Sequence, residues 1–167
     1  VENMPKGNYI VIPETSSEKR KYTPIGFLTP DILCSNAIRL APNATLYHFG
    51  ILTSNVHMAW MRVVCGRLKS DYRYSKDIVY NNFPWPTATD EQKAKIEQTG
   101  QAILDARAKY PESSLADLYD EVTMPAELCK AHQDNDRAVM AAYKFDTKMT
   151  EIECVAELFK MYNKLTK

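Results

Sequence analysis

A dense cluster of basic and aromatic side chains is the part of this 167-residue sequence most suited to binding chemistry. Its members fall within ten residues, namely Arg67, Lys69, Tyr72, Arg73, Tyr74 and Lys76. Basic side chains neutralise DNA phosphates, so Arg67, Arg73 and Lys76 are candidate contacts to a DNA backbone. The rings of Tyr72 and Tyr74 are candidates for stacking on bases. By spacing alone, a solvated charge cluster that follows a helix is the slightly favoured interpretation.

Lys69 and Asp71 within this cluster are separated by one residue. In an extended segment, both side chains would point to the same side. A lysine donates to the acceptors of guanine, and a carboxylate accepts from the cytosine amine. The pair is therefore a candidate for reading one G·C base pair.

A second basic run, formed by Lys19, Arg20 and Lys21, follows the first expected strand. A solvated hairpin loop is the favoured interpretation of this run. If both basic runs lie on one face, however, they form a cleft wide enough for a duplex, and all three residues become candidate contacts to phosphates.

Signatures of catalysis are missing from the sequence. It contains no GxGxxG, GxxxxGK[ST], HExxH or GxSxG motif. We expect His48 and His57 to act as helix caps or core contacts, and His132 to form a buried hydrogen-bonded pair with Asn135. The four cysteines include no CxxC pair, which favours single buried thiols over a zinc site. We therefore predict no catalytic residue and no metal ligand.

The net charge of zero excludes a uniformly basic nucleic-acid-binding chain. It also hides a division of the chain after Pro86. Residues 1–86 hold ten basic and six acidic residues, whereas residues 87–167 hold eleven and fifteen. Such asymmetry indicates two modules with different roles.

The first module has the texture of short strands and turns around one helix. Its expected strands are residues 9–13, 21–28, 38–40, 45–49 and 77–80. Between them, apolar residues recur at three- and four-residue steps from Val56 to Leu68, which predicts a central helix capped near Ser54. No apolar run is long enough for a membrane helix.

The second module is predicted to be helical. Capping-box patterns begin at Thr89 and Thr150, a short helix is expected from Ser114, and Pro125 begins another. The fold class is therefore α+β, with a mixed β half around a central helix followed by an α-helical half.

Several long segments are similar to the C-terminal region of the MmeI-like DNA methyltransferases, which are large single-chain restriction–modification enzymes. They are residues 16–28, 42–47, 57–68 and 72–86, and residues 117–139 resemble the C-terminal helical domain of that family. The resemblance implies that residues 1–86 are the C-terminal part of a DNA target-recognition domain and that residues 87–167 are a helical C-terminal domain.

The resemblance also implies an activity for the parent enzyme, which would transfer a methyl group from S-adenosylmethionine to adenine in a specific DNA sequence. Neither an NPPY-type motif nor a glycine-rich cofactor motif occurs here, and the sequence starts at Val1. We therefore expect a fragment that binds no cofactor itself and whose methyltransferase domain, with any nuclease, lies upstream. Double-stranded DNA and that upstream domain are the expected partners, in the bacterial cytoplasm and without a membrane.

Specific positions follow from the resemblance as well. The family reads bases just after its Gly-Arg-Leu motif, which places Lys69 and Asp71 at base-reading positions and reverses the preference for a solvated cluster. The alternative is a protein-interaction module, in which the acidic helical half binds a partner chain and the basic segment is only solvated. Salt-dependent DNA binding distinguishes the two functions.

Overall fold

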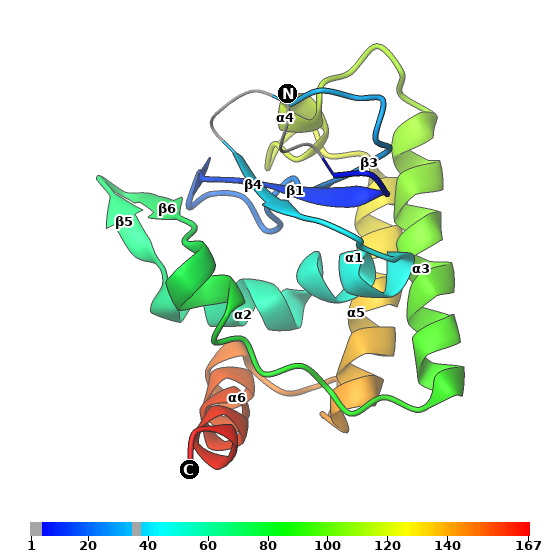
Figure 1. Cartoon of the computed structure of the whole chain (residues 1–167). Coiled ribbons are helices and arrows are strands. Elements are labelled where there is room, and N and C mark those ends of the chain that lie inside the picture. The colour runs from blue at the N-terminus through cyan, green and yellow to red at the C-terminus, as the bar shows by residue number, and fades with distance from the viewer. Residues whose placement is uncertain (1–4, 35–37) are drawn as a thin grey trace.

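A computed structural model describes residues 5–34 and 38–167 of the chain (Figure 1). The elements are β1 (Tyr9–Pro13), β2 (Thr15–Ser16), β3 (Gly26–Leu28), β4 (Ile38–Ala41), α1 (Leu46–Leu52), α2 (Asn55–Val64), β5 (Gly66–Leu68), β6 (Asp71–Arg73), the π-helix η1 (Lys76–Tyr80), α3 (Asp90–Ala108), α4 (Leu115–Leu118), α5 (Ala126–Tyr143) and α6 (Glu151–Leu165). All described strands precede the long helices α3, α5 and α6, which confirms the predicted α+β class. No described helix is long and apolar enough to cross a membrane.

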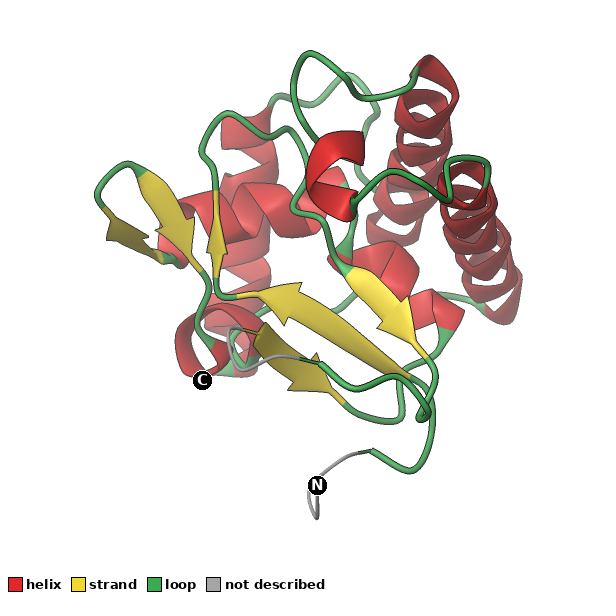
Figure 2. Ribbon diagram, turned by 90° about the horizontal axis from the view of Figure 1, so that it is seen from above, coloured by secondary structure: helices red, strands yellow, loops and turns green. Residues whose placement is uncertain are grey.

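Two small antiparallel sheets organise the first half. One has the strand order β3-β1-β4 and the other β2-β6-β5. Strand β1 alternates, so that Ile10 and Ile12 are buried in the core while Val11 is only partly buried. Helices α1 and α2 lie beneath the first sheet in Figure 1, and Figure 2 shows its other face in front of the helices. The second sheet projects beside α2 and carries the predicted base-reading hairpin.

The expected strand at residues 45–49 is wrong, because this segment enters helix α1. Thr45 caps the helix, and the Nδ1 atom of His48 accepts a hydrogen bond from the Thr45 backbone N–H at 3.1 Å. This confirms the capping role expected of His48. The helix buries Phe49, Ile51 and Leu52 on the shared core, and that burial outweighs the strand-like run of side chains.

The expected strand at residues 77–80 is also wrong. These residues form the π-helix η1, in which the Asn81 N–H donates to the Lys76 carbonyl oxygen at 2.9 Å. The turn buries Val79, whose carbonyl oxygen accepts from the Trp60 indole at 3.0 Å. Two further elements are shorter than expected. The strand predicted at 21–28 is limited to Gly26–Leu28, and the helix predicted to reach Leu68 ends at Val64.

The helical half follows the predicted pattern closely. Thr89 and Thr150 both form complete capping boxes, and Ser114 caps the short helix α4. Pro125 is the N-cap of α5 rather than its first helical residue. One continuous hydrophobic cluster contains residues of both halves, so the helical half packs directly on the strands and helices before it.

His132 and Asn135 are both fully buried on α5, but the expected hydrogen-bonded pair between them is wrong. The Nε2 atom of His132 lies 2.5 Å from the Tyr119 hydroxyl. The Asn135 amide instead donates to the Gly50 carbonyl oxygen at 2.8 Å and accepts from the Thr99 hydroxyl at 2.8 Å. Both side chains bond to other segments instead: Tyr119 directly follows α4, Gly50 belongs to α1 and Thr99 to α3.

Candidate nucleic-acid interface

The β5–β6 hairpin carries most of the predicted DNA-binding residues. Gly66 pairs with Arg73, Arg67 with Tyr72, and Leu68 with Asp71. The two remaining residues, Lys69 and Ser70, form the turn, in which Lys69 has a positive φ of 56°. Two-residue hairpin loops need such a backbone conformation because it matches the twist of the flanking strands.

The predicted geometry of the base-reading pair, with both side chains on one side of an extended segment, is wrong. Lys69 and Asp71 do not lie in one extended segment, because Lys69 is at the turn and Asp71 begins β6. Lys69 is exposed at the tip, and Asp71 is partly buried. Their side chains are therefore placed by the turn and not by the alternation of a strand.

The second basic run is brought next to this hairpin by β2. Thr15 pairs with Arg73 and Ser16 with Tyr72, so β2 is an outer strand of the hairpin sheet. Lys19, Arg20 and Lys21 follow directly in the loop after β2. The two basic runs thus belong to one region of the molecule, although they are about fifty residues apart in the sequence.

Arg67 contacts three parts of this region. Its guanidinium lies 4.1 Å from the centre of the Tyr72 ring, donates to the Ser70 carbonyl oxygen at 2.7 Å, and is 3.6 Å from a Glu18 carboxylate oxygen. The first contact is of the cation–π type, and the second fixes the hairpin turn. Arg67 therefore links the turn, β6 and the loop of the second basic run.

The two tyrosines are supports of the hairpin rather than free rings. Tyr72 is 8% exposed and lies under Arg67, and Tyr74 is 3% exposed. The Tyr74 hydroxyl is 2.9 Å from the Nε2 atom of His57, a fully buried residue of α2. Burial lowers the pKa of His57 to about 3, so the imidazole is neutral at physiological pH. This burial argues against the predicted base stacking, and it confirms that His57 is a core contact.

The backbone of the basic run is fastened to both halves of the molecule. Arg62 of α2 donates to the Lys21 carbonyl oxygen at 2.6 Å and pairs with Glu151 at 2.9 Å. The next residue, Tyr22, is buried, and its hydroxyl donates to the Asp136 carboxylate at 2.5 Å. Sequence reasoning missed this anchor, because nothing local marks Tyr22 and Asp136 as partners 114 positions apart.

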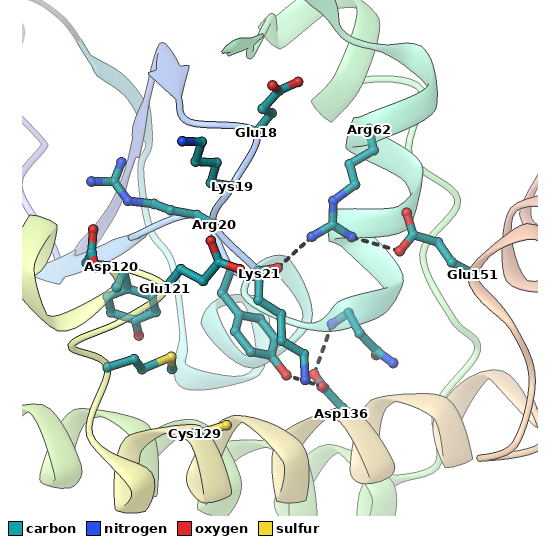
Figure 3. A pocket seen from close by; sticks show the side chains of 14 residues that line it. Glu18, Lys19, Arg20, Lys21, Arg62, Asp120, Glu121, Cys129, Asp136 and Glu151 are labelled. Carbon is teal, nitrogen blue, oxygen red and sulfur yellow. Dashed lines mark hydrogen bonds and ion pairs between the residues drawn. The ribbon is translucent and has the colours of Figure 1, made fainter. Parts of the chain in front are cut away.

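A pocket of about 640 Å³ lies between the basic run and the helical half. Figure 3 shows Lys19 and Arg20 spread along its upper wall and Lys21 extending down toward Asp136. The positive charge of Lys21 helps to lower the pKa of Asp136, but burial dominates and raises that pKa to about 6. Lys21 therefore faces the helical half, whereas Lys19 and Arg20 are directed elsewhere along the loop.

The remaining predicted cations are on the surface. Arg73 and Lys76 are exposed, and Lys76 is the first residue of η1, directly after the capping residue Ser75. The structure thus brings the hairpin cations and the loop after β2 together. The buried tyrosines Tyr22, Tyr72 and Tyr74 support this region from beneath. Such a surface fits a polyanion, whose phosphates exposed cations neutralise.

Comparisons with known proteins place the chain in a family. Residues 1–87 match the family model of the MmeI target recognition domain, and residues 88–167 match that of the MmeI C-terminal domain. This chain belongs to the MmeI family. The membership confirms the resemblance that the sequence predicted.

Two known proteins are similar to this chain. A solved structure of the Type IIL restriction-modification enzyme MmeI in complex with DNA is 49% identical, with a TM-score of 0.93 over 98% of this chain and 22% of that one. DNA methyltransferase A of Bacillus subtilis (strain 168) is 42% identical over 160 residues, which cover 95% of this chain and 18% of that protein. The chain therefore spans about a fifth of the length of either relative.

Proposed function

We propose that this chain recognises a specific double-stranded DNA sequence on behalf of an S-adenosylmethionine-dependent, adenine-specific DNA methyltransferase of the restriction-modification type. Residues 1–86 are the C-terminal part of its target-recognition domain, and residues 87–167 are its helical C-terminal domain. The observation that carries the proposal is the β2-β6-β5 sheet, which joins both basic runs in one exposed region of a chain from the MmeI family. The DNA complex of the aligned MmeI enzyme supports the choice of ligand.

Within this interface, Lys69 and Asp71 read bases. The hairpin turn projects Lys69, and Asp71 follows at the start of β6. The phosphate contacts come from the cations around them, namely Lys19, Arg20, Arg67, Arg73 and Lys76, whereas Lys21, also predicted from the sequence, extends toward Asp136 instead. Base contacts of this kind determine which sequence is bound, while phosphate contacts determine affinity and register.

Methyl transfer belongs to the remainder of the parent protein, which also binds S-adenosylmethionine and lies upstream as a partner domain. The named methyltransferase relative is more than five times as long as the aligned region, which leaves room for such a domain. The parent acts in the bacterial cytoplasm, where its DNA is found.

A charge exchange at the hairpin tests the base-reading role. In the full-length enzyme, Lys69→Asp combined with Asp71→Lys should change the preferred base at one position of the methylated site, because donor and acceptor exchange places. The site is read by sequencing methylated DNA. The matched control exchanges Lys130 and Asp134, an exposed pair on α5 at 2.6 Å, and should leave specificity unchanged. An unaltered site in the hairpin variant would refute the base-reading assignment.

Removal of one phosphate contact tests the backbone role. Lys76→Ala should weaken binding to all DNA sequences alike and lower the slope of log K against log salt by about 1. The measurement is a salt titration of DNA affinity with the full-length enzyme. Lys164→Ala, an exposed lysine of α6, is the control that should keep the slope. Binding that does not respond to salt in the unaltered enzyme would favour a protein-interaction module instead.

A further inference from the structure

A small cavity lies where the two sheets meet. Residues 39–42, from β4 and the turn that follows it, line one side, and Tyr74, Lys76 and Tyr80 line the other. Its volume is about 100 Å³. Tyr74 directly follows Arg73, the last residue of β6, so the cavity adjoins the region that carries the hairpin cations.

The interior of this cavity is apolar. It is lined by Ile12 and Tyr74, which are 2% and 3% exposed. The Tyr74 hydroxyl is already hydrogen-bonded to His57 and makes no demand on a ligand. The partly buried Tyr80 and the more exposed Leu40 add further carbon surface. An interior of this kind suits an apolar group, because a charge enclosed there alone would lose its hydration.

Two cations stand at the rim, Arg39 on one side and Lys76 on the other, and both are exposed. Arg39 pairs with Glu14 at 3.1 Å, with both side chains accessible to solvent. Exposed pairs contribute little to stability, so a phosphate can replace Glu14 as the partner of Arg39. Asp77, next to Lys76, accepts a hydrogen bond from Asn81 at 3.3 Å. Both cations are therefore available to an anion.

The size and the chemistry of the cavity select one part of DNA. Pockets that take whole small molecules measure about 300–1,000 Å³, so this one admits only a single group. A nucleotide joins an apolar sugar ring to a charged phosphate. The apolar interior and the cationic rim provide the same combination in the same order.

We propose that the cavity holds one sugar–phosphate unit of bound DNA, with the deoxyribose against Leu40 and Tyr80 and the phosphate between Arg39 and Lys76. Arg39 exchanges Glu14 for the phosphate as DNA binds. The proposal rests on the proposed function, because its ligand is the DNA bound at the hairpin, and it extends that interface to β4. Such a contact fixes the register of the duplex and carries no sequence information itself.

Substitution of Arg39 in the full-length enzyme tests the phosphate contact. Arg39→Gln should weaken binding to all duplexes alike, by about tenfold at about 0.1 M salt, lower the slope of log K against log salt by about 1, and leave the methylated site unchanged. Arg137→Gln is the matched control, since Arg137 is also an exposed arginine, paired with Asp134 at 2.7 Å. Equal affinities and slopes of the two variants would overturn the proposal.

A double variant tests whether the two cations share one phosphate. Arg39→Gln combined with Lys76→Ala should lose less affinity than the product of the two single losses, because the first substitution already displaces the phosphate from the second cation. Independent losses would place the cations on separate phosphates and overturn the shared site. Salt-independent binding by the unaltered enzyme would overturn the proposed function as well, whereas a normal response of Lys76→Ala beside an inert Arg39→Gln would overturn this inference alone.

Thiol labelling identifies the source of the phosphate. In the full-length enzyme, Leu40→Cys should react with a maleimide several-fold more slowly when duplex DNA is added, as read at that residue by peptide mass spectrometry. Leu115→Cys on α4 is the matched control and should keep its rate, because the two leucines are 38% and 36% exposed. An unchanged rate of Leu40→Cys with DNA would overturn the proposal. Equal protection by inorganic phosphate or a free deoxynucleotide would also overturn it, because the site would then belong to a small ligand.

Discussion

The bond between Tyr22 and Asp136 holds the second basic run on the helical half, and Tyr22→Phe removes it. The hydroxyl donates at 2.5 Å to one carboxylate oxygen of Asp136, and the other oxygen accepts from the Asn55 backbone N–H at 2.9 Å. A buried hydrogen bond to a charged group contributes about 1.5–3 kcal/mol. At roughly 2–4 °C per kcal/mol for a chain of this size, the melting temperature should fall by roughly 3–12 °C.

The loss should depend on pH with a definite sign. Burial raises the pKa of Asp136 from 3.8 to about 6, while the bond from Tyr22 lowers it. Because the folded pKa exceeds the unfolded one, ionised Asp136 costs stability above pH 6, and this cost disappears as the pH falls toward 4. The Tyr22 bond favours the ionised form, so its contribution is complete above pH 6 and decreases below it. Tyr22→Phe should therefore cost more at pH 8 than at pH 4.5.

Urea unfolding of the 167-residue chain and its variants at both pH values measures this difference. The comparison must be made between variants, because His57 also makes the stability of the protein depend on pH. Burial lowers the pKa of His57 to about 3, so the folded protein loses stability as the pH falls below 6.5, which is opposite to the effect of Asp136. Tyr110→Phe is the control, since Tyr110 donates to the more exposed Glu127 and should cost much less. An equal loss at both pH values, or a loss no larger than that of Tyr110→Phe, would refute the anchor.

Two predictions concern buried contacts, one between helices and one beneath the hairpin. Gly50→Ala should destabilise the chain by about 1–3 kcal/mol in urea unfolding, since its Cβ atom would lie 2.5 Å from Ile96 Cγ2 and 3.1 Å from the Ile96 carbonyl oxygen. Gly66→Ala, with open space around it, is the control, and equal stability of the two variants would contradict the packing argument. Tyr74→Phe should cost about 1–3 kcal/mol, because it leaves the buried His57 Nε2 without its partner. A neutral result in the same assay would show that this bond does not support the hairpin.

Local signals predicted much of the fold. The capping boxes at Thr89 and Thr150 were identified because Thr and a partner three residues later satisfy free amides within one turn. The β-branched run at Tyr9–Pro13 is a strand for similarly local reasons. The strand predicted at 77–80 was wrong because the burial of Val79 beneath Trp60 decides the conformation of this segment. That contact joins residues 19 positions apart in the sequence.

The candidate interface was predicted only in part. Charge spacing identified both basic runs, and the resemblance identified Lys69 and Asp71. The pairing of Thr15 and Ser16 with β6, which brings the runs together, depends on a two-residue strand that has no recognisable pattern. The turn at Lys69 was missed for a related reason, because positive φ at a lysine has no compositional signal such as Asn-Gly.

The first half of the chain has a surplus of basic residues, and the second half has a surplus of acidic ones. If the surplus charges served to hold the halves together, ion pairs would cross between them. Among the described residues, only the pair of Arg62 and Glu151 does so. The junction is built instead from the shared hydrophobic cluster and from hydrogen bonds, such as those of Tyr22 to Asp136 and of Arg107 to the Ile25 carbonyl oxygen. The surplus positive charge of the first half is therefore left at its surface, where a polyanion rather than the helical half can neutralise it.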